Sequence, residues 1–62
     1  MNTAIRTNMG TDFTVIVVDI NNGNEVDHVS GNLCNPEEVA ALAEFLKKWA
    51  DNSDVTVDLS ID

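Results

Sequence analysis

Hydrophobic and polar residues alternate strictly over the segment 54–62. Every odd position is apolar and every even position is polar. Because successive side chains of a β-strand point to opposite faces of a sheet, a period of two predicts a half-buried strand. Its apolar face would carry Val55, Val57, Leu59 and Ile61, and its polar face Asp54, Thr56, Asp58, Ser60 and Asp62.

The segment Asp12–Ile20 is rich in β-branched residues and is followed by the cluster Asn21-Asn22-Gly23-Asn24. A β-branched run that ends in such residues predicts a strand followed by a turn. The Asn-Gly pair favours a type I′ turn, in which both central residues adopt a positive φ. We therefore expect a hairpin whose returning strand is Glu25–Ser30, with a loop at 31–34.

The predicted strand at Asp12–Ile20 carries apolar residues on both faces. One face holds Phe13, Val15 and Val17, and the other holds Ile16, Val18 and Ile20. A single helix covers only one face of a sheet, and an uncovered apolar face is typical of a dimer interface or a partner site. Two alternatives stay open: the N-terminal segment folds across this face, or the strand is central and twisted.

The segment Pro36–Asp51 has the features of an amphipathic helix. Asn35 is a good N-cap, Pro36 suits the first helical position, and the acidic residues that follow match the helix dipole. Apolar residues then recur three and four positions apart, at Val39, Leu42, Ala43, Leu46, Trp49 and Ala50. This period predicts a stripe that faces the core, Trp49 included. Phe45 lies off the stripe and is expected to fill the helix edge or to flank a partner surface.

These patterns together predict an α+β fold. We expect a small antiparallel sheet of three to four strands with one helix packed on one face, in the order (β)ββαβ. The bracketed strand is Thr3–Met9, where the alternation of apolar and polar residues is weaker. No repeat, linker or low-complexity tract interrupts the sequence, so residues 1–62 are expected to form a single small domain.

The charge is strongly unbalanced, with eleven acidic and three basic side chains and a formal net charge of −8. Arg6, Lys47 and Lys48 are too few to replace the counterions of a nucleic acid, and the negative field repels phosphates. The longest apolar run, Val15–Val18, is also far shorter than the ~20 residues of a membrane-spanning helix. We therefore expect neither direct nucleic-acid binding nor membrane association.

The sequence favours a cytoplasmic protein. Residues 1–6 lack the apolar segment and cleavage site of a secretory signal. Cys34 is the single cysteine, so no internal disulfide can form, whereas small secreted domains usually carry several.

The small size limits both stability and activity. Folding hides only about 60% of the surface of such a chain. Hydrophobic burial then contributes roughly 90 kcal/mol, and ordering the chain costs about the same. Because the balance is near zero, a second copy or a tightly bound partner would stabilise the fold. A thin core also leaves little space for a substrate pocket, so we expect no enzymatic activity.

Metal ions and cofactors are not expected. The segment 19–25 is similar to a calcium-binding loop, but its glycine stands at the fifth place instead of the sixth, and Ser30 stands where glutamate is required. His28 and Cys34 are fewer ligands than a zinc site uses. The same two residues lack the orienting group and oxyanion loop of a nucleophile and its base.

Acidic residues on the predicted sheet suggest a binding surface. Same-face residues of a strand are ~6.8 Å apart, close to the phosphate spacing of a nucleic-acid strand. A row of carboxylates could therefore occupy the basic groove of a nucleic-acid-binding protein; the alternative is a solvated face that keeps the protein soluble. The candidate partner-binding residues are Asp54, Asp58, Asp62, Asp12, Glu25 and Asp27, the last two on one face of the returning strand.

In size, charge and predicted architecture the chain resembles small inhibitors encoded by phages and other mobile elements, such as anti-CRISPR proteins and DNA-mimic inhibitors of host nucleases. The resemblance covers the whole chain and involves no shared motif. It implies an acidic inhibitor that blocks the DNA-recognition surface of a CRISPR effector complex or another host protein that handles nucleic acids. Two other hypotheses are a small homodimeric accessory or structural protein, and a toxin-binding antitoxin.

Overall fold

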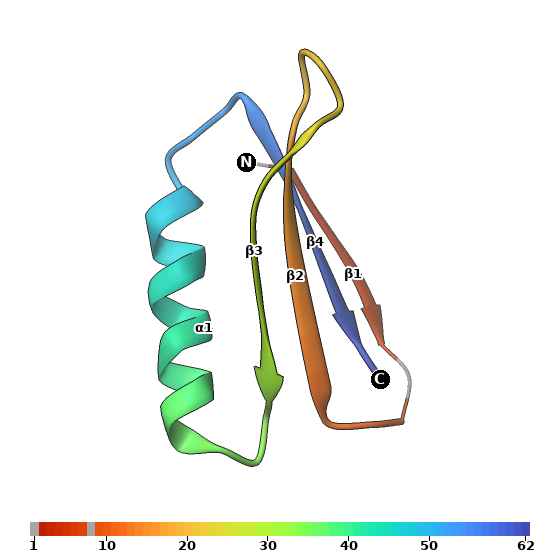
Figure 1. The fold of residues 1–62 in the computed structure, drawn as a ribbon, viewed down its shortest axis with the longest axis vertical. Coiled ribbons are helices and arrows are strands. Elements are labelled where there is room, and N and C mark those ends of the chain that lie inside the picture. Colours follow the sequence, from red (N-terminus) through yellow and green to blue (C-terminus); the bar gives the residue numbers. More distant parts are fainter. Residues whose placement is uncertain (1, 8) are drawn as a thin grey trace.

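Four strands and one helix form the computed structural model, which describes residues 2–7 and 9–62 (Figure 1). Their bounds, in chain order, are β1 (Asn2–Thr7), β2 (Asp12–Asp19), β3 (Glu25–Asn32), α1 (Pro36–Trp49) and β4 (Val55–Ile61). The predicted α+β class and element order are confirmed. The N-terminal segment supplies the fourth strand of the sheet.

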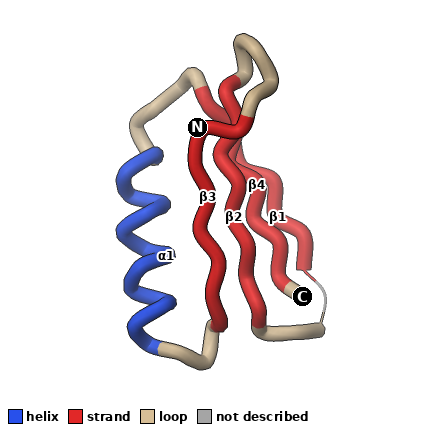
Figure 2. The backbone as a smooth tube through the Cα atoms, viewed as in Figure 1, coloured by secondary structure: helices blue, strands red, loops and turns tan. Residues whose placement is uncertain are grey.

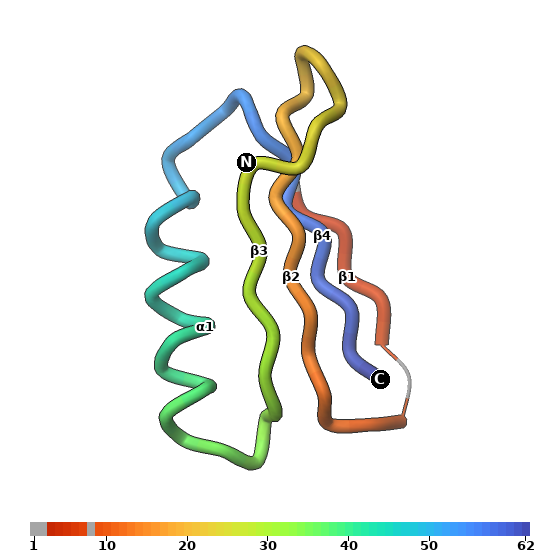
Figure 3. The backbone as a smooth tube through the Cα atoms, in the orientation of Figure 1, coloured from red at the N-terminus to blue at the C-terminus, as the bar shows by residue number. Residues whose placement is uncertain are grey.

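The strands form one mixed sheet in the order β1-β4-β2-β3. β2 pairs antiparallel with β3 and β4, whereas β1 pairs parallel with β4. The sheet therefore differs from the antiparallel one expected from the sequence. β1 and β2 run in opposite directions, and β4 runs antiparallel to β2, so β4 runs in the same direction as β1. Figure 3 shows the first and last strands side by side.

The core lies between the sheet and α1. Its buried side chains come from the two central strands: Phe13, Val15 and Val17 of β2, and Val55 and Val57 of β4. The helix lies alongside β3 (Figure 2), and none of its own residues is fully buried. Its partly buried side chains against the core are Leu42, Phe45, Leu46 and Trp49.

The apolar stripe of α1 is therefore rotated from the predicted one. Phe45 belongs to it, whereas Ala43 and Ala50 are exposed and Val39 is 37% exposed. Phe45 packs against the core, because the helix lies over the β3 side of the sheet. The expectation that Trp49 faces the core is confirmed.

The start of α1 matches the prediction. The Asn35 side chain accepts hydrogen bonds from the backbone N–H groups of Glu37 and Glu38, at 3.0 and 3.4 Å. Pro36 stands at the first helical position. The helix ends at Trp49, two residues before the predicted end, with Ala50 as its C-cap.

The hairpin connection is longer than predicted, and the expected type I′ turn is wrong. Gly23 has a φ of 75°, but no non-glycine residue in the described ranges has a positive φ. A type I′ turn at Asn22-Gly23 would require a positive φ at both residues. Instead the loop 20–24 connects the strands, and the Gly23 N–H donates to the carbonyl of Asp19 at 2.8 Å.

A β-bulge near this loop changes the faces of β3. Val17 stands opposite Asp27, but Val18 stands opposite Glu25, so Val26 is an extra residue on the β3 side. A bulge interrupts the regular alternation of side chains between the two faces. Residues on either side of Val26 therefore do not follow the simple period of two.

β3 continues two residues beyond its predicted end, through Gly31 to Asn32. A Cβ atom at Gly31 would lie 2.8 Å from Cζ of Phe13 and 2.8 Å from Oε2 of Glu38. Only glycine therefore lets the aromatic ring and the first turn of α1 approach the strand this closely. Although glycine is typical of loops, Gly31 is part of β3 because Phe13 and Glu38 pack so closely against it.

Candidate functional site

The sheet face opposite α1, called the open face below, is not covered by any element that the structure describes. Strand register and burial place two fully polar rows at one of its ends. The outer row is Asp62, Asp12 and Asn32, and the next is Arg6, Ser60, Thr14 and Ser30. These two rows are called the polar end.

Asp12 and Asp62 form the centre of the polar end. The Asp12 N–H donates to the Asp62 carbonyl at 3.0 Å, and the Asp62 N–H donates to the Asp12 carbonyl at 2.8 Å. Residues that exchange both bonds have Cα atoms ~5.5 Å apart and side chains on one face. Both side chains are exposed. The pairing therefore presents two carboxylates next to each other from distant parts of the sequence.

Asn32 holds one of these carboxylates in place. Its Nδ2 donates to Oδ1 of Asp12 at 2.8 Å and to Oγ1 of Thr11 at 3.1 Å. Its own Oδ1 accepts from the backbone N–H of Cys34 at 2.7 Å. Because the amide is fixed by these bonds, it orients Asp12 without neutralising its charge.

The next row of the open face has a different character, because Asp58 is paired there with Arg6. The guanidinium Nη2 lies 2.8 Å from Oδ2 of Asp58. The register places Ala4 and Ile16 on either side of Asp58, and its Oδ1 is buried without a hydrogen-bond partner. The Asp58 side chain is 32% exposed. Asp58 is therefore a neutralised, half-buried acid.

Apolar residues gather at the far end of the open face, next to Glu25. Oε2 of Glu25 lies 3.4 Å from Nδ1 of His28. Ile16 and Val18, on the open face of β2, are half-buried. The prediction that the second face of β2 is an uncovered apolar surface is confirmed for Ile16 and Val18.

Asp27 points to the helix side of the sheet, not to the open face. It stands opposite the buried Val17, and its Oδ2 lies 3.2 Å from Nζ of Lys48 in α1. The expectation that Glu25 and Asp27 share one face is wrong, because the bulge at Val26 lies between them.

The pKa of Asp27 is lowered from its ordinary value. The main cause is the backbone N–H of His28, which donates to Oδ1 at 2.9 Å, and partial burial opposes it. The hydrogen bond and the charge of Lys48 also lower the pKa of Asp27, and the nearby Trp49 indole lowers it slightly further. The indole Nε1 itself makes no hydrogen bond. Asp27 is therefore a structural contact between β3 and α1.

Asp54 lies just before β4 and is exposed. Its N–H is bound by Oδ1 of Asn52 at 2.8 Å, and its carbonyl accepts from the N–H of Ile20 at 3.0 Å. The predicted row of carboxylates is therefore divided. Asp12 and Asp62 stand together at the polar end, Asp58 is paired in the middle, and Asp54 and Glu25 lie toward the other end.

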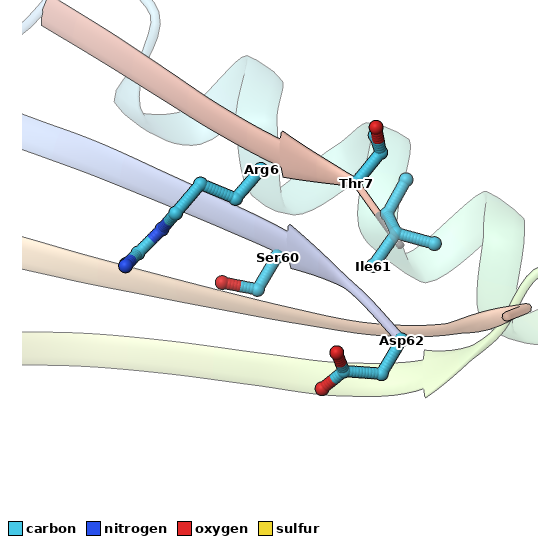
Figure 4. A pocket seen from close by; sticks show the side chains of 5 residues that line it. All are labelled: Arg6, Thr7, Ser60, Ile61 and Asp62. Carbon is cyan, nitrogen blue, oxygen red and sulfur yellow. The ribbon is translucent and has the colours of Figure 1, made fainter. Parts of the chain in front are cut away.

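The edge of the polar end forms a shallow, open depression, lined by Arg6, Thr7, Ser60, Ile61 and Asp62. Figure 4 shows Arg6, Ser60 and Asp62 extending to one side of the strands, and Thr7 and Ile61 to the other. On the open face Ser60 and Asp62 offer hydroxyl and carboxylate oxygens, while the Arg6 guanidinium is bound to Asp58. Such groups can accept hydrogen bonds and charge from arginine or lysine.

Metal-binding residues do not converge in residues 2–7 and 9–62, where no group of three or more histidine, cysteine, aspartate or glutamate side chains could hold a metal ion. His28 is engaged with Glu25 on β3, and Cys34 is an exposed free thiol in the loop before α1.

Two residues of this surface were missed in the sequence. The sequence pattern predicts a loop at 31–34 and so misses Asn32, although a hairpin register with Val15 opposite Val29 places Asn32 opposite Asp12. No pattern in the sequence points to Arg6, because its contact with Asp58 depends on the pairing of β1 with the last strand. A short-range pattern contains no information about that pairing.

The chain matches no protein-family model, and no curated protein or solved structure was found to match it. In the part of the chain that the structure describes, no helix is long and apolar enough to cross a membrane.

Proposed function

We propose that the protein is an acidic inhibitor that binds the basic nucleic-acid-recognition surface of a host defence protein. In its specific form, the proposal is an anti-CRISPR protein that blocks target DNA binding by a CRISPR effector complex in the host cytoplasm. The observation that carries it is the pair Asp12 and Asp62, two exposed carboxylates held side by side at the polar end.

The distribution of cations supports this proposal. Arg6 is paired with Asp58, and Lys48 with Asp27. Among the described residues no ion pair involves Asp12 or Asp62. Their charge is available to a partner, and arginine or lysine side chains that normally bind phosphates would complement it.

Because the acids are divided between separate parts of the open face, they match only a short stretch of nucleic-acid phosphates. Adjacent Cα atoms at Asp12 and Asp62 are ~5.5 Å apart, comparable to neighbouring phosphates. Asp58, ~13 Å from Asp62 along the strand, is already neutralised by Arg6. We therefore propose competition for a small group of basic residues at the polar end, instead of imitation of a long nucleic-acid strand. No catalytic step is part of this function.

The test measures target-DNA binding by a panel of purified, guide-loaded CRISPR effector complexes in the presence of the protein. We expect at least one complex to lose DNA binding, and we expect this inhibition to weaken with rising salt because surface charges are screened. The double variant Asp12→Asn/Asp62→Asn should weaken binding to that complex by about tenfold, ~1.4 kcal/mol.

The matched control is Glu44→Gln/Asp51→Asn, which removes the same charge from exposed positions in and after α1. It should retain nearly full inhibition. Equal weakening by both double variants would show that total charge, and not the polar end, is responsible. DNA binding that stays unaffected in every complex would contradict the specific anti-CRISPR form of the proposal.

A further inference from the structure

The outer edge of β1 is an unpaired strand edge. β1 stands at the end of the sheet and pairs only with β4. Within the described residues, no other element pairs with its outer side. Such an edge exposes backbone N–H and C=O groups that can pair with a further strand. At the other end of the sheet, β3 has α1 alongside it.

Among the elements that the structure describes, β1 alone has no acidic residue. All eleven acidic residues follow position 11, and the segment 1–11 contains Arg6 as its one charged side chain. The other elements all carry carboxylates: Asp12 and Asp19 in β2, Glu25 and Asp27 in β3, Glu37, Glu38 and Glu44 in α1, and Asp58 in β4. A second chain of charge −8 therefore meets the least repulsion at β1.

Ile5 and Arg6 leave this edge accessible. Ile5 is 64% exposed and lies on the helix side, opposite Leu59. Charged side chains often protect a strand edge from pairing. Here the guanidinium of Arg6 is bound to Asp58 at 2.8 Å, so it lies over its own sheet. Asp58, the acid nearest to β1, is neutralised by the same contact.

Two other arrangements fit the charges less well. A two-fold interface uses the same patch twice, so a dimer packed through the open face would press together two surfaces that each carry Asp12, Asp62 and Glu25. A basic extended peptide would find no carboxylate along β1 to pair with. A second copy of this chain therefore suits the edge best.

We propose that the protein forms a two-fold dimer in which β1 of one copy pairs antiparallel with β1 of the other. Two sheets of four strands would then join into one continuous sheet. With the axis perpendicular to the sheet, the two Ile5 side chains come together on the helix side, and both polar ends lie on the same outer face. The proposal does not depend on the proposed function.

Sedimentation velocity over a range of protein concentrations tests this arrangement. We expect a monomer–dimer equilibrium that shifts toward the dimer as salt rises, because screening reduces repulsion between like-charged copies. Ile5→Lys should raise the dissociation constant at least about tenfold. The matched control Val26→Lys changes an exposed apolar residue on the opposite edge strand and should leave the constant unchanged.

Three results would overturn the proposal: a monomer at every concentration, an Ile5→Lys variant that dimerises like the parent chain, or a dimer disrupted by Ile16→Lys on the open face instead. Hydrogen exchange on the unmodified protein provides a test without a variant. Amides of β1 should gain protection as concentration rises, and protection independent of concentration would also contradict the proposal. The opposite salt dependence separates this result from inhibitor binding, which salt weakens.

Discussion

Asp12 and Asp62 are joined by two backbone hydrogen bonds, of 3.0 and 2.8 Å, that close the polar end of the open face. Gly10, two residues before β2, lies directly against the backbone of Asp62. A Cβ atom built on Gly10 would overlap the backbone carbonyl of Asp62. The placement of the two carboxylates therefore depends on a glycine that neither strand contains.

Gly10→Ala should destabilise the protein, because the added methyl group displaces either the connection or the end of β4. We expect a loss of about 1 to 3 kcal/mol, typical of an inserted group that forces the backbone to shift. Urea unfolding followed by Trp49 fluorescence measures it. For comparison, a Cβ at Gly23 meets no atom within 4 Å, so Gly23→Ala carries only the cost of its positive φ, ~1 kcal/mol. A stable Gly10→Ala variant with unchanged Asp12 and Asp62 amide protection would contradict the close contact.

The contact between Asp27 and Lys48 should make stability depend on pH. The pKa of Asp27 lies below its ordinary value of 3.8, chiefly through the His28 N–H and then through Lys48. A depressed folded-state pKa contributes stability above pH 3.8, and this contribution is lost as the pH falls through the folded-state pKa. The stability difference between the parent chain and Asp27→Asn should therefore shrink below about pH 3.8.

Unfolding curves at several pH values test this, with Glu44→Gln as the control. Glu44 is exposed and takes part in none of the ion pairs seen among residues 2–7 and 9–62. A difference between the parent chain and Asp27→Asn that stays constant from neutral pH to pH 2 would contradict the assignment. Titration of the Asp27 carboxyl carbon by NMR gives the pKa directly.

Neighbouring residues of β2 should respond differently to truncation. Val15 is fully buried against the helix side, whereas Ile16 is half-buried on the open face. Val15→Ala should cost about 2 kcal/mol through lost burial and a residual cavity. Ile16→Ala removes more atoms but should cost less, because water already reaches this side chain. Urea unfolding compares the two variants, and a larger loss for Ile16→Ala would indicate that the open face is covered in solution.

The N-cap of α1 should contribute measurably because the helix has no fully buried residue of its own. Asn35→Ala removes the acceptor for the N–H groups of Glu37 and Glu38 and should cost about 1 kcal/mol. Asn35→Ser retains a capping oxygen and should restore most of the loss. Helix content by circular dichroism and the unfolding midpoint provide the measurements. Equal stability of the Ala and Ser variants would show that the cap is unimportant.

The sequence predicted those features that depend on neighbouring residues. Asn35 and Pro36 determine the start of α1, since a capping oxygen and a fixed φ act within one turn. The alternation in 54–62 determined which side of β4 is buried, and Val55 and Val57 are in the core. Strong local patterns of this kind need no knowledge of the rest of the chain.

The predicted site was less complete, because its geometry combines distant segments. The sequence predicts Asp12 and Asp62 as candidate residues, but their direct pairing follows from the register of β2 and β4. The assumption that residues two apart share a face failed at Glu25 and Asp27. One extra residue, Val26, turns them to opposite sides, and nothing in the local sequence marks this bulge.

The sequence by itself determined the helix, the alternating strands, the excess of acid and the absence of acidic residues before position 12. Tertiary structure alone decided that β4 inserts between β1 and β2, that Arg6 neutralises Asp58, and that β1 stays at an open edge. The physical reason is the range of the interactions. Caps and periodicity act over a few residues, whereas the choice of strand partner depends on how the whole apolar face is buried against α1.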